Sequence, residues 1–567
     1  MTPDKTGQAQ STPGISSVAD QGVRDQALDI RHSFAVSAPA GSGKTGLLIR
    51  RTLRLLAECD HPEQVLAITF TRKAAAEMQE RILKALLEGQ DPTPPDDTYR
   101  RAIWEDARQV IARDTNKGWQ LIANPGRLRI MTIDSLCRHL ARQLAVESGL
   151  GDLPEPAEQP ESYYREAVHN LFALLDAPGP VGDSLALLLE HLDNNPATLE
   201  SLLVDLLGRR EQWLHPLLSS RDARETLEQA MQDTVTSSLS KLRAALRPVA
   251  SDVAGLCDYA AANLLHLHIA SPLTLGLGMT DLPGSEASAE NVAGWHAIAE
   301  LLLTRSGGWR ARPDKRSGFP TAKDAVDPQR ADAAKQQLAE VIDWCRSQEA
   351  LLELFNDLRH LPALAFSDSQ WRLLEALAQL LPRLVAELSV VFQAHHACDF
   401  TEISLAAQRA LGDEDDPSDL SLRLDYQIRH ILVDEFQDTS SLQFDLLKKL
   451  VAGWQPGDGR TLFLVGDAMQ SLYGFRNANV GLFLEARKGR VNQVELTPLD
   501  LTVNFRSDST LVSWVNHTFT TVFPPREDIS RGAVPYAMAQ AARKGDPQAR
   551  VTLDLFPQGS DETREAE

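Results

Sequence analysis

Residues 38–45 read Ala38-Pro39-Ala40-Gly41-Ser42-Gly43-Lys44-Thr45. The apolar run 33–37 before them predicts a strand, and apolar residues at helical spacing from 45 to 58 predict a helix. Glycines let backbone N–H groups close around phosphate oxygens, and the positive end of a helix favours the same charge. In such a loop we expect Lys44 to reach the β- and γ-phosphates and the Thr45 hydroxyl to ligate Mg²⁺. Residues 38–45 are therefore predicted to hold ATP.

Strands and helices alternate along the chain on both sides of a long central segment. Strands are predicted at 65–69, 128–132, 428–433 and 461–465, and helices at 74–87 and 134–146. Such alternation implies an α/β fold with a parallel sheet covered by helices on both faces.

The alternation stops between residues 147 and 390, where Leu and Ala recur at helical spacing. We predict a large α-helical insertion into the sheet domain. Within it, residues 309–316 form a basic stretch with one aromatic residue, Trp309. Two interpretations stay open for this stretch, a solvated surface loop and a contact with nucleic acid.

Composition excludes some classes of protein. The formal net charge of −21 lacks the basic footprint typical of nucleic-acid binding, so any such contact must use a local groove. The five cysteines are scattered without a Cys-x-x-Cys pair, which argues against zinc, iron–sulfur clusters and disulfides and indicates buried thiols. No apolar run approaches the ~18–20 residues that span a bilayer, and residues 1–21 lack a signal-peptide core. We expect a cytoplasmic protein without membrane contact.

Two acidic residues, Asp434 and Glu435, follow the predicted strand 428–433. The phosphate loop should lie beside this strand. One carboxylate can then hold Mg²⁺ while its neighbour polarises the attacking water. We assign Asp434 to the metal and Glu435 to the water. Adjacent residues on a strand face opposite ways, so both reach the site only if the chain curls at the strand's end.

Four further segments form an ordered set with the phosphate loop. In chain order they are Thr69-Phe70-Thr71-Arg72-Lys73-Ala74-Ala75, Asp434-Glu435-Phe436-Gln437-Asp438-Thr439, Gly466-Asp467-Ala468-Met469-Gln470-Ser471 and Asn504-Phe505-Arg506-Ser507. This order resembles the UvrD/Rep-type superfamily-1 helicases, and the long insertion resembles their RecB/AddA branch. The resemblance implies a RecA-like P-loop NTPase domain in an ATP-dependent DNA helicase or translocase. Such a motor is expected to move 3′ to 5′ along single-stranded DNA in double-strand-break repair and recombination.

The resemblance also implies roles for single residues at the nucleotide. It assigns γ-phosphate sensing to Gln470 and packing on adenine to Phe505. It assigns a γ-phosphate contact to Arg506, where a guanidinium would stabilise transition-state charge.

For the DNA strand, the resemblance implies contacts by Phe70 and Arg72 and base stacking by Tyr473 and Phe475. Stacking accepts every base, because every base has a π face. Two shorter segments, 132–135 and 399–402, resemble motifs that flank the insertion.

Three positions depart from the family's pattern or leave it undecided. Ala38 stands where the strict loop pattern has its first glycine, a change that is common in this family. Gly46 stands where many relatives carry a larger side chain that helps to sandwich adenine. Gln21 and Gln26 compete for the position of the glutamine that reads adenine, and the sequence does not decide between them.

The resemblance covers the first motor domain and implies a domain organisation. We expect a flexible N-terminus (1–23), motor domain 1A in two parts (24–146 and 391–507), helical insertion 1B (147–390) and the start of a second motor domain (508–567). No candidate for that domain's further motifs, or for the C-terminal nuclease of RecB/AddA relatives, follows. We therefore expect the N-terminal portion of a longer polypeptide, which alone binds nucleotide and DNA without unwinding duplex.

Two rival interpretations stay open. One is a P-loop ATPase of another class, such as a transporter motor or a small-molecule kinase. The other is a truncated module that binds nucleotide and DNA without turnover. The expected partners are ATP, Mg²⁺, single-stranded or duplex-end DNA, and a partner protein with nuclease or helicase activity.

Overall fold

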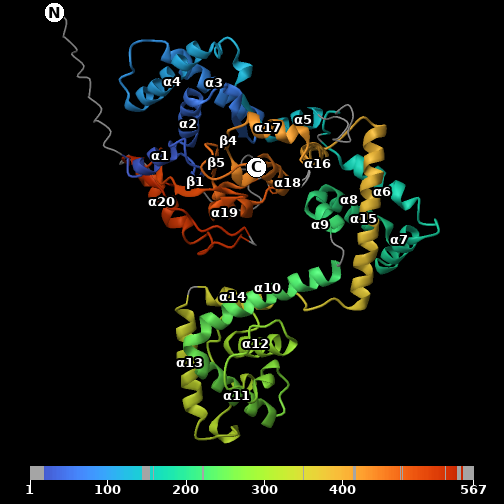
Figure 1. Cartoon of the computed structure of the whole chain (residues 1–567). Coiled ribbons are helices and arrows are strands. Elements are labelled where there is room, and N and C mark those ends of the chain that lie inside the picture. The colour runs from blue at the N-terminus through green and yellow to red at the C-terminus, as the bar shows by residue number, and fades with distance from the viewer. Residues whose placement is uncertain are drawn as a thin grey trace, which may run out of the picture. The chain divides into compact units, whose positions relative to one another are not determined.

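Six parallel strands form the sheet that carries the phosphate loop (Figure 1). Their order is β3-β2-β4-β5-β1-β8, and every neighbouring pair is parallel. The strands are β1 (Phe34–Ser37), β2 (Val65–Thr69), β3 (Arg129–Thr132), β4 (His430–Val433), β5 (Thr461–Gly466) and β8 (Thr497–Asp500). The four central strands β2, β4, β5 and β1 are buried along nearly their whole length, as apolar strands of a parallel sheet should be. The predicted α/β fold with a parallel sheet is confirmed.

The computed structural model describes residues 18–143, 154–157, 159–219, 223–348, 350–412, 417–472, 474, 477–529, 532–545 and 551–552. The chain divides into two compact units. Unit 1, which contains the sheet, comprises Met1–Tyr164, Leu206–Gln212 and Ser389–Glu567. Unit 2 comprises Arg165–Asp205 and Trp213–Leu388.

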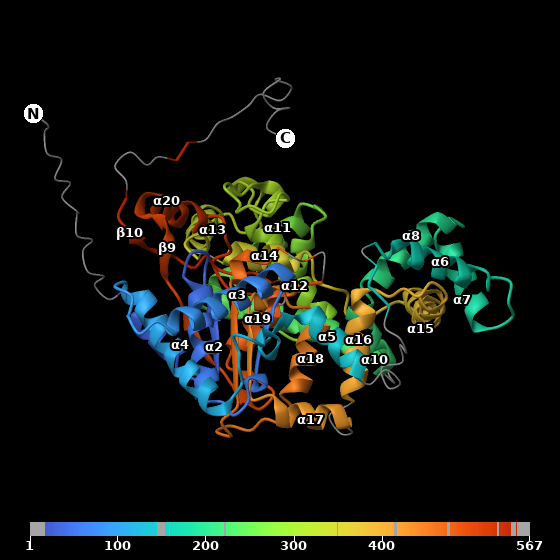
Figure 2. The ribbon, with the colours of Figure 1, turned by 90° about the horizontal axis from the view of Figure 1, so that it is seen from above.

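Helices cover both faces of the sheet in unit 1 (Figure 2). Successive strand residues point to opposite faces, so Ala35 of β1 joins one apolar core and Phe34 and Val36 join the other. One face carries α1 (Gln21–Ala27), α2 (Lys44–Glu58), α3 (Arg72–Gly89) and α4 (Thr98–Lys117). The other carries α5 (Ile133–Gln143), α16 (Phe400–Leu411), α17 (Asp419–Gln427), α18 (Ser441–Leu450) and α19 (Val480–Arg487).

A smaller parallel pair follows the main sheet in the chain. β9 (Val503–Asp508) begins three residues after β8 and pairs with β10 (Gln540–Arg543), with α20 (Ser509–Phe519) packed against both. The short antiparallel pair β6 (Arg490–Val491) and β7 (Val494–Glu495) precedes them. The 3₁₀ turns of unit 1 are η1 (Pro62–Gln64), η2 (Pro125–Arg127), η7 (Phe436–Asp438) and η8 (Ala468–Gln470).

Unit 2 is built from helices. Its apolar core is formed by α10 (Ala223–Leu246), α11 (Ala250–His266), α12 (Ala289–Leu302), α13 (Ala331–Arg346) and α14 (Leu351–Leu358). The remaining helices belong to it wholly or in part: α6 (Glu161–Phe172), α7 (Pro180–His191), α8 (Pro196–Gly208), α9 (Arg210–Ser219) and α15 (Asp368–Ala394). Within the described part of unit 2, 3₁₀ turns lie in the connections from α10 to α13: η3 (Arg247–Val249), η4 (Pro272–Gly276), η5 (Lys315–Ser317) and η6 (Ala322–Asp324).

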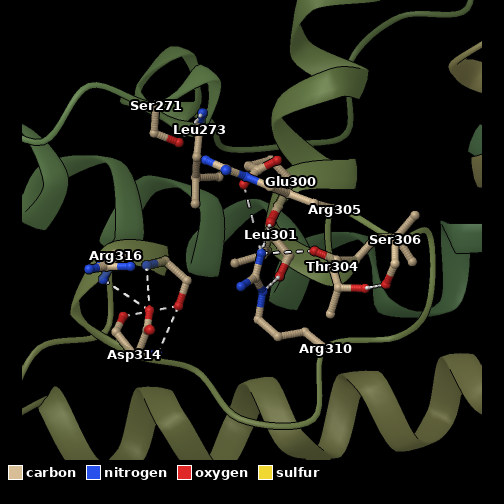
Figure 3. A network of polar contacts seen from close by, with 12 residues as sticks. Ser271, Leu273, Glu300, Leu301, Thr304, Arg305, Ser306, Arg310, Asp314 and Arg316 are labelled. Atoms are coloured by element: carbon tan, nitrogen blue, oxygen red, sulfur yellow. Dashed lines mark hydrogen bonds and ion pairs between the residues drawn. The ribbon is translucent and has the colours of Figure 1, made fainter.

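The basic stretch 309–316 is largely held by contacts within unit 2 (Figure 3). The Arg310 guanidinium donates to the backbone carbonyls of Glu300, Leu301 and Leu303 at 2.6, 3.0 and 2.8 Å. These carbonyls lie at the C-terminal end of α12, where the helix supplies no N–H partners. Asp314 accepts from the backbone N–H of Arg316 and so fixes the turn. Arg310 is therefore a helix cap, which favours the interpretation as a structured surface loop.

Three smaller findings bear on the sequence analysis. All five cysteines are buried, as expected, and burial raises the pKa of the Cys59 thiol to about 12. The boundary expected at residue 23 falls inside α1, and Asp20 before it is buried. Within the described ranges, no helix is both long and apolar enough to cross a membrane.

Candidate nucleotide and strand-binding site

The phosphate loop lies directly against strand β9. Gly41 and Gly43 have φ angles of 80° and 81°, a left-handed conformation that glycine adopts without strain. A Cβ atom on Gly41 would lie 2.7 Å from Asn504 Oδ1 and 2.9 Å from Arg506 Cβ. Glycine is therefore required at position 41 both by the backbone angle and by the close approach of β9.

Lys44 forms ion pairs with both acidic residues after β4. Its Nζ lies 3.1 Å from Asp434 Oδ1 and 2.5 Å from Glu435 Oε1. Burial opposes the charge of Lys44, but the two carboxylates outweigh burial and raise its pKa. Burial raises the pKa of Asp434 despite the lysine, whereas the charge of Lys44 overcomes burial and lowers the pKa of Glu435. The lysine thus neutralises two carboxylates that differ in their tendency to ionise.

The chain curls at the end of β4, which is what brings both carboxylates to Lys44. Glu435 has a φ of 54°, in the left-handed region, and its backbone N–H donates to Asp434 Oδ1 at 2.9 Å. A non-glycine residue in this conformation is uncommon and carries some strain. The curl that the sequence analysis required is present.

A side-chain amide connects Glu435 to the segment after β5. Gln437 Nε2 donates to Glu435 Oε2 at 2.9 Å, and Gln437 Oε1 accepts from the backbone N–H of Asp467 at 3.0 Å. Gln470 in turn donates to the Asp467 carboxylate. Gln470 is therefore linked to Glu435 through two intervening residues, Asp467 and Gln437.

The segment Asn504-Phe505-Arg506 lies on the phosphate loop. The backbone N–H of Phe505 donates to the Gly41 carbonyl at 2.8 Å, and Asn504 Nδ2 donates to the Ala40 carbonyl at 3.2 Å. Phe505 and Arg506 are both exposed. The structure thus joins the first and the last of the sequence segments singled out for nucleotide binding.

Sequence reasoning missed a buried anchor beneath this segment. Asp20 Oδ2 accepts from the backbone N–H groups of Thr502 and Val503, each at 3.0 Å. Asp20 also binds Arg24 through both carboxylate oxygens, at 2.7 and 2.8 Å. Arg24 then places its guanidinium 5.0 Å from the centre of the Phe505 ring. The only signal in the sequence was the Asp20–Arg24 spacing of four residues, which is ordinary for a helix.

The site fits a nucleotide with a divalent cation. Ser42 Oγ in the loop is buried and has no hydrogen-bond partner, as expected of a group that awaits a phosphate oxygen. If Lys44 turns toward phosphates, Asp434 and Glu435 need another cation. No cluster of three His, Cys, Asp or Glu side chains suited to a metal occurs among the described residues. Asp434 and Thr45, with phosphate oxygens and water, would make the oxygen-rich set that Mg²⁺ prefers.

A groove in unit 1 gathers three of the other predicted segments. Its cavity measures about 380 Å³, and we call it the Phe70 groove. Phe70, Asp134, Phe400 and Thr401 line it, from segments far apart in the sequence. Arg72 is exposed at the start of α3. The other two predicted strand contacts, Tyr473 and Phe475, lie outside the described residues, but Asn477 lines the groove.

One wall of the Phe70 groove rests on a buried ion pair that sequence reasoning missed. Arg210 donates to both oxygens of Asp399, at 2.7 and 2.6 Å, and its side chain is 0% exposed. The Tyr164 hydroxyl donates to Asp399 Oδ2 at 2.5 Å, and Asp399 caps α16 by accepting from the Glu402 N–H. Asp399 is therefore a structural anchor for the segment 399–402.

Comparison with known proteins finds one matching family model and a set of similar chains. The model of the UvrD/REP helicase N-terminal domain matches residues 21–490. The chain is 26% identical over 551 residues to an ATP-dependent helicase/nuclease subunit of Exiguobacterium sibiricum, covering 92% of this chain and 41% of that protein. The same-named protein of Moorella thermoacetica is 28% identical over 535 residues, covering 87% and 34%. That of Desulfitobacterium hafniense (strain DCB-2) is 25% identical, covering 92% and 37%. The chain thus spans about two fifths of the length of these relatives.

Proposed function

This chain belongs to the UvrD/REP helicase N-terminal domain family, and on that premise we propose that it is the nucleotide-binding motor portion of an ATP-dependent DNA helicase. The proposed motor moves 3′ to 5′ along single-stranded DNA in double-strand-break repair. We propose that it works beside a nuclease or helicase partner protein, since its relatives are named as subunits of an ATP-dependent helicase/nuclease. The division into motor domain 1A, helical insertion 1B and the start of a second motor domain remains part of this proposal, but the flexible N-terminus is not proposed to extend to residue 23, because α1 begins at Gln21.

One observation carries the proposal. Lys44 of the phosphate loop contacts Asp434 and Glu435, while Phe505 and Arg506 lie on the same loop. A strand-end carboxylate pair, a loop lysine and a nearby arginine are the parts that phosphoryl transfer to water requires.

Each group has a proposed role in hydrolysis. Thr45 and Asp434 would hold Mg²⁺, which would supply charge neutralisation at the phosphates. Glu435 orients and polarises the attacking water through its carboxylate. Lys44 binds the terminal phosphates, Arg506 stabilises the charge that develops on them, and Gln470 senses the γ-phosphate.

The link from Gln470 to Glu435 supports coupling to DNA. The segment that contains Gln470 runs on to Asn477 in the Phe70 groove. We propose that Phe70, Tyr473 and Phe475 hold the strand by stacking. Arg72, which is exposed at the start of α3 and is not among the residues that line the groove, would add a contact by charge. Because the net charge of the chain is −21, the whole surface does not attract DNA. We therefore propose that DNA binds through such a local groove.

DNA-stimulated ATP hydrolysis by the 567-residue chain tests the proposal. We expect hydrolysis to rise on addition of oligo(dT) and to vanish in Lys44→Ala, which lacks the mobile cation of the loop. Hydrolysis that ignores DNA would favour a P-loop ATPase of another class. Nucleotide and DNA binding without any turnover would favour the non-enzymatic module.

Phe70→Ala should weaken binding of single-stranded DNA by about 1–3 kcal/mol, the loss expected for one base-stacking partner. Fluorescence anisotropy with labelled oligo(dT) and with a mixed sequence measures it, and we expect equal losses for the two. ATP affinity should stay unchanged, because Phe70 lies in the groove and not on the phosphate loop. Wild-type DNA affinity with a lowered melting temperature would instead show that Phe70 serves the apolar core.

A further inference from the structure

Gly46 leaves a space that a distant tyrosine fills. A Cβ atom on Gly46 would lie 1.8 Å from the Tyr99 hydroxyl oxygen and 2.9 Å from Tyr99 Cζ. Gly46 lies in the first turn of α2, two residues after Lys44. Any side chain at position 46 would therefore expel the Tyr99 hydroxyl from the end of the phosphate loop.

Tyr99 is held in this place by the packing of α4 on α2. Asp106 of α4 is buried and accepts from Arg50 at 2.7 Å and from Arg54 at 3.0 Å, both on α2. Asp97 caps the N-terminus of α4, where Tyr99 stands, by accepting from the Arg100 N–H. Two ion pairs and a cap thus fix the helix that carries Tyr99.

The exposure of Tyr99 is unusual for a side chain that only fills space. The residue is 51% exposed, although its hydroxyl end is enclosed against Gly46 and burial raises its pKa. A tyrosine that packed into the core would bury its ring and leave its hydroxyl at the surface. Here the hydroxyl lies against Gly46, while about half of the residue's surface remains exposed.

A second aromatic ring approaches the same end of α2. A Cβ on Gly43 would lie 3.6 Å from two ring carbons of Phe505 and 3.5 Å from an Arg24 nitrogen. Gly43 is the N-cap of α2 and Gly46 lies in its first turn, so both belong to the same end of the helix. Arg24 is also among the charges that act on the Tyr99 hydroxyl. Tyr99, Phe505 and Arg24 therefore surround the exit of the phosphate loop.

We propose that Tyr99 is a wall of the base pocket, where its ring packs on the aromatic base of the bound nucleoside triphosphate beside Phe505. The inference rests on the proposed nucleotide site and adds a base-contacting residue to it. The phosphates fill the loop, so the base must emerge beside the first turn of α2. Aromatic rings and guanidinium groups bind a base by stacking on its π face.

Tyr99→Ala should weaken binding of ATP·Mg²⁺ about tenfold, the order expected for loss of one stacking partner. The affinity for inorganic tripolyphosphate, which has no base, should stay the same. Isothermal titration of both ligands separates these effects, and Tyr99→Phe should restore most of the ATP affinity. Tyr426→Ala on α17 makes the same change at a residue that is 88% exposed, and it should alter neither affinity.

Gly46→Ala tests the contact between Gly46 and Tyr99 by changing the glycine instead of the tyrosine. The added methyl should lower ATP affinity severalfold when Tyr99 is present, because the hydroxyl must leave its place. It should have little effect in the Tyr99→Ala background, so the two substitutions should be strongly non-additive. Melting temperatures of all variants confirm that each is folded.

The outcomes distinguish this inference from the proposed function. Wild-type ATP affinity in Tyr99→Ala, or an equal loss for tripolyphosphate, would overturn the role of Tyr99 and leave the nucleotide site in place. Failure of the wild-type chain to bind either ligand would instead overturn the proposed function. Additive effects of the Gly46 and Tyr99 substitutions would also overturn the inference.

Discussion

Glu435→Gln should slow ATP hydrolysis by roughly 10²–10⁴, the range typical of losing a general base, while ATP remains bound. The amide cannot accept a proton from water, but it keeps the size of the carboxylate. It also removes one of the two negative charges that hold Lys44 at 2.5 and 3.1 Å, so the lysine is freer to bind phosphate. We therefore expect ATP affinity to stay equal or to rise. Single-turnover hydrolysis and equilibrium titration with ATP measure the two quantities separately.

Asp434→Asn tests the role of the other carboxylate in the pair. It should shift the Mg²⁺ concentration needed for nucleotide binding, because Asp434 is proposed to hold the metal. Glu485→Gln on the exposed side of α19 makes the same chemical change as Glu435→Gln and should behave as wild type. If Glu435→Gln and Asp434→Asn respond alike in a Mg²⁺ titration, the division of roles between the two carboxylates is wrong.

Arg210→Ala should reduce the free energy of unfolding by about 3–5 kcal/mol, the range found when one partner of a buried ion pair is removed. The substitution leaves Asp399 at 3% exposure without the guanidinium that contacts both of its oxygens. It also leaves Glu402 without a charge 3.6 Å away. Chemical denaturation followed by circular dichroism measures the loss, and one wall of the Phe70 groove should loosen with it.

The neighbouring Arg209→Ala provides the control, since Arg209 is exposed and such substitutions usually change stability by less than about 0.5 kcal/mol. The pH dependence gives a second check. Burial opposes ionisation of Asp399, but Arg210 outweighs burial and lowers its pKa. The carboxylate therefore stabilises the fold above its ordinary pKa and loses this effect as pH falls through the lowered value. Equal losses for Arg210→Ala and Arg209→Ala would contradict the structural role of the ion pair.

Local patterns were enough to predict the sheet and the chemistry at its edge. The glycine-rich loop between a strand and a helix predicted a phosphate site, and acidic residues after an apolar strand predicted its companions. The structure brings Lys44, Asp434 and Glu435 together as this reasoning required. The order of the segments also resembled the family to which the chain belongs.

Contacts between distant single residues could not be predicted in this way. Arg210 and Asp399 are 189 residues apart, and Asp20 lies 483 residues before Val503. No local pattern in the sequence connects the two residues of such a pair. The sequence identifies the segment 399–402 only by its resemblance to a family motif, and it does not show that Asp399 is a structural anchor.

The sequence by itself determined the elements, the parallel sheet and the loop chemistry, because strand and helix periodicity and glycine conformation act between near neighbours in the chain. Only the tertiary structure decided what surrounds these elements. It placed the Tyr99 hydroxyl against Gly46, Arg24 over Phe505, and a buried ion pair behind the Phe70 groove. These contacts depend on how the helices pack on the sheet. That packing is determined by the shape of the whole helix and sheet faces that meet, and not by any short stretch of sequence. In the sequence, Gly46 is a departure from the family's pattern. In the fold, the absence of a side chain at Gly46 leaves the space that the Tyr99 hydroxyl occupies.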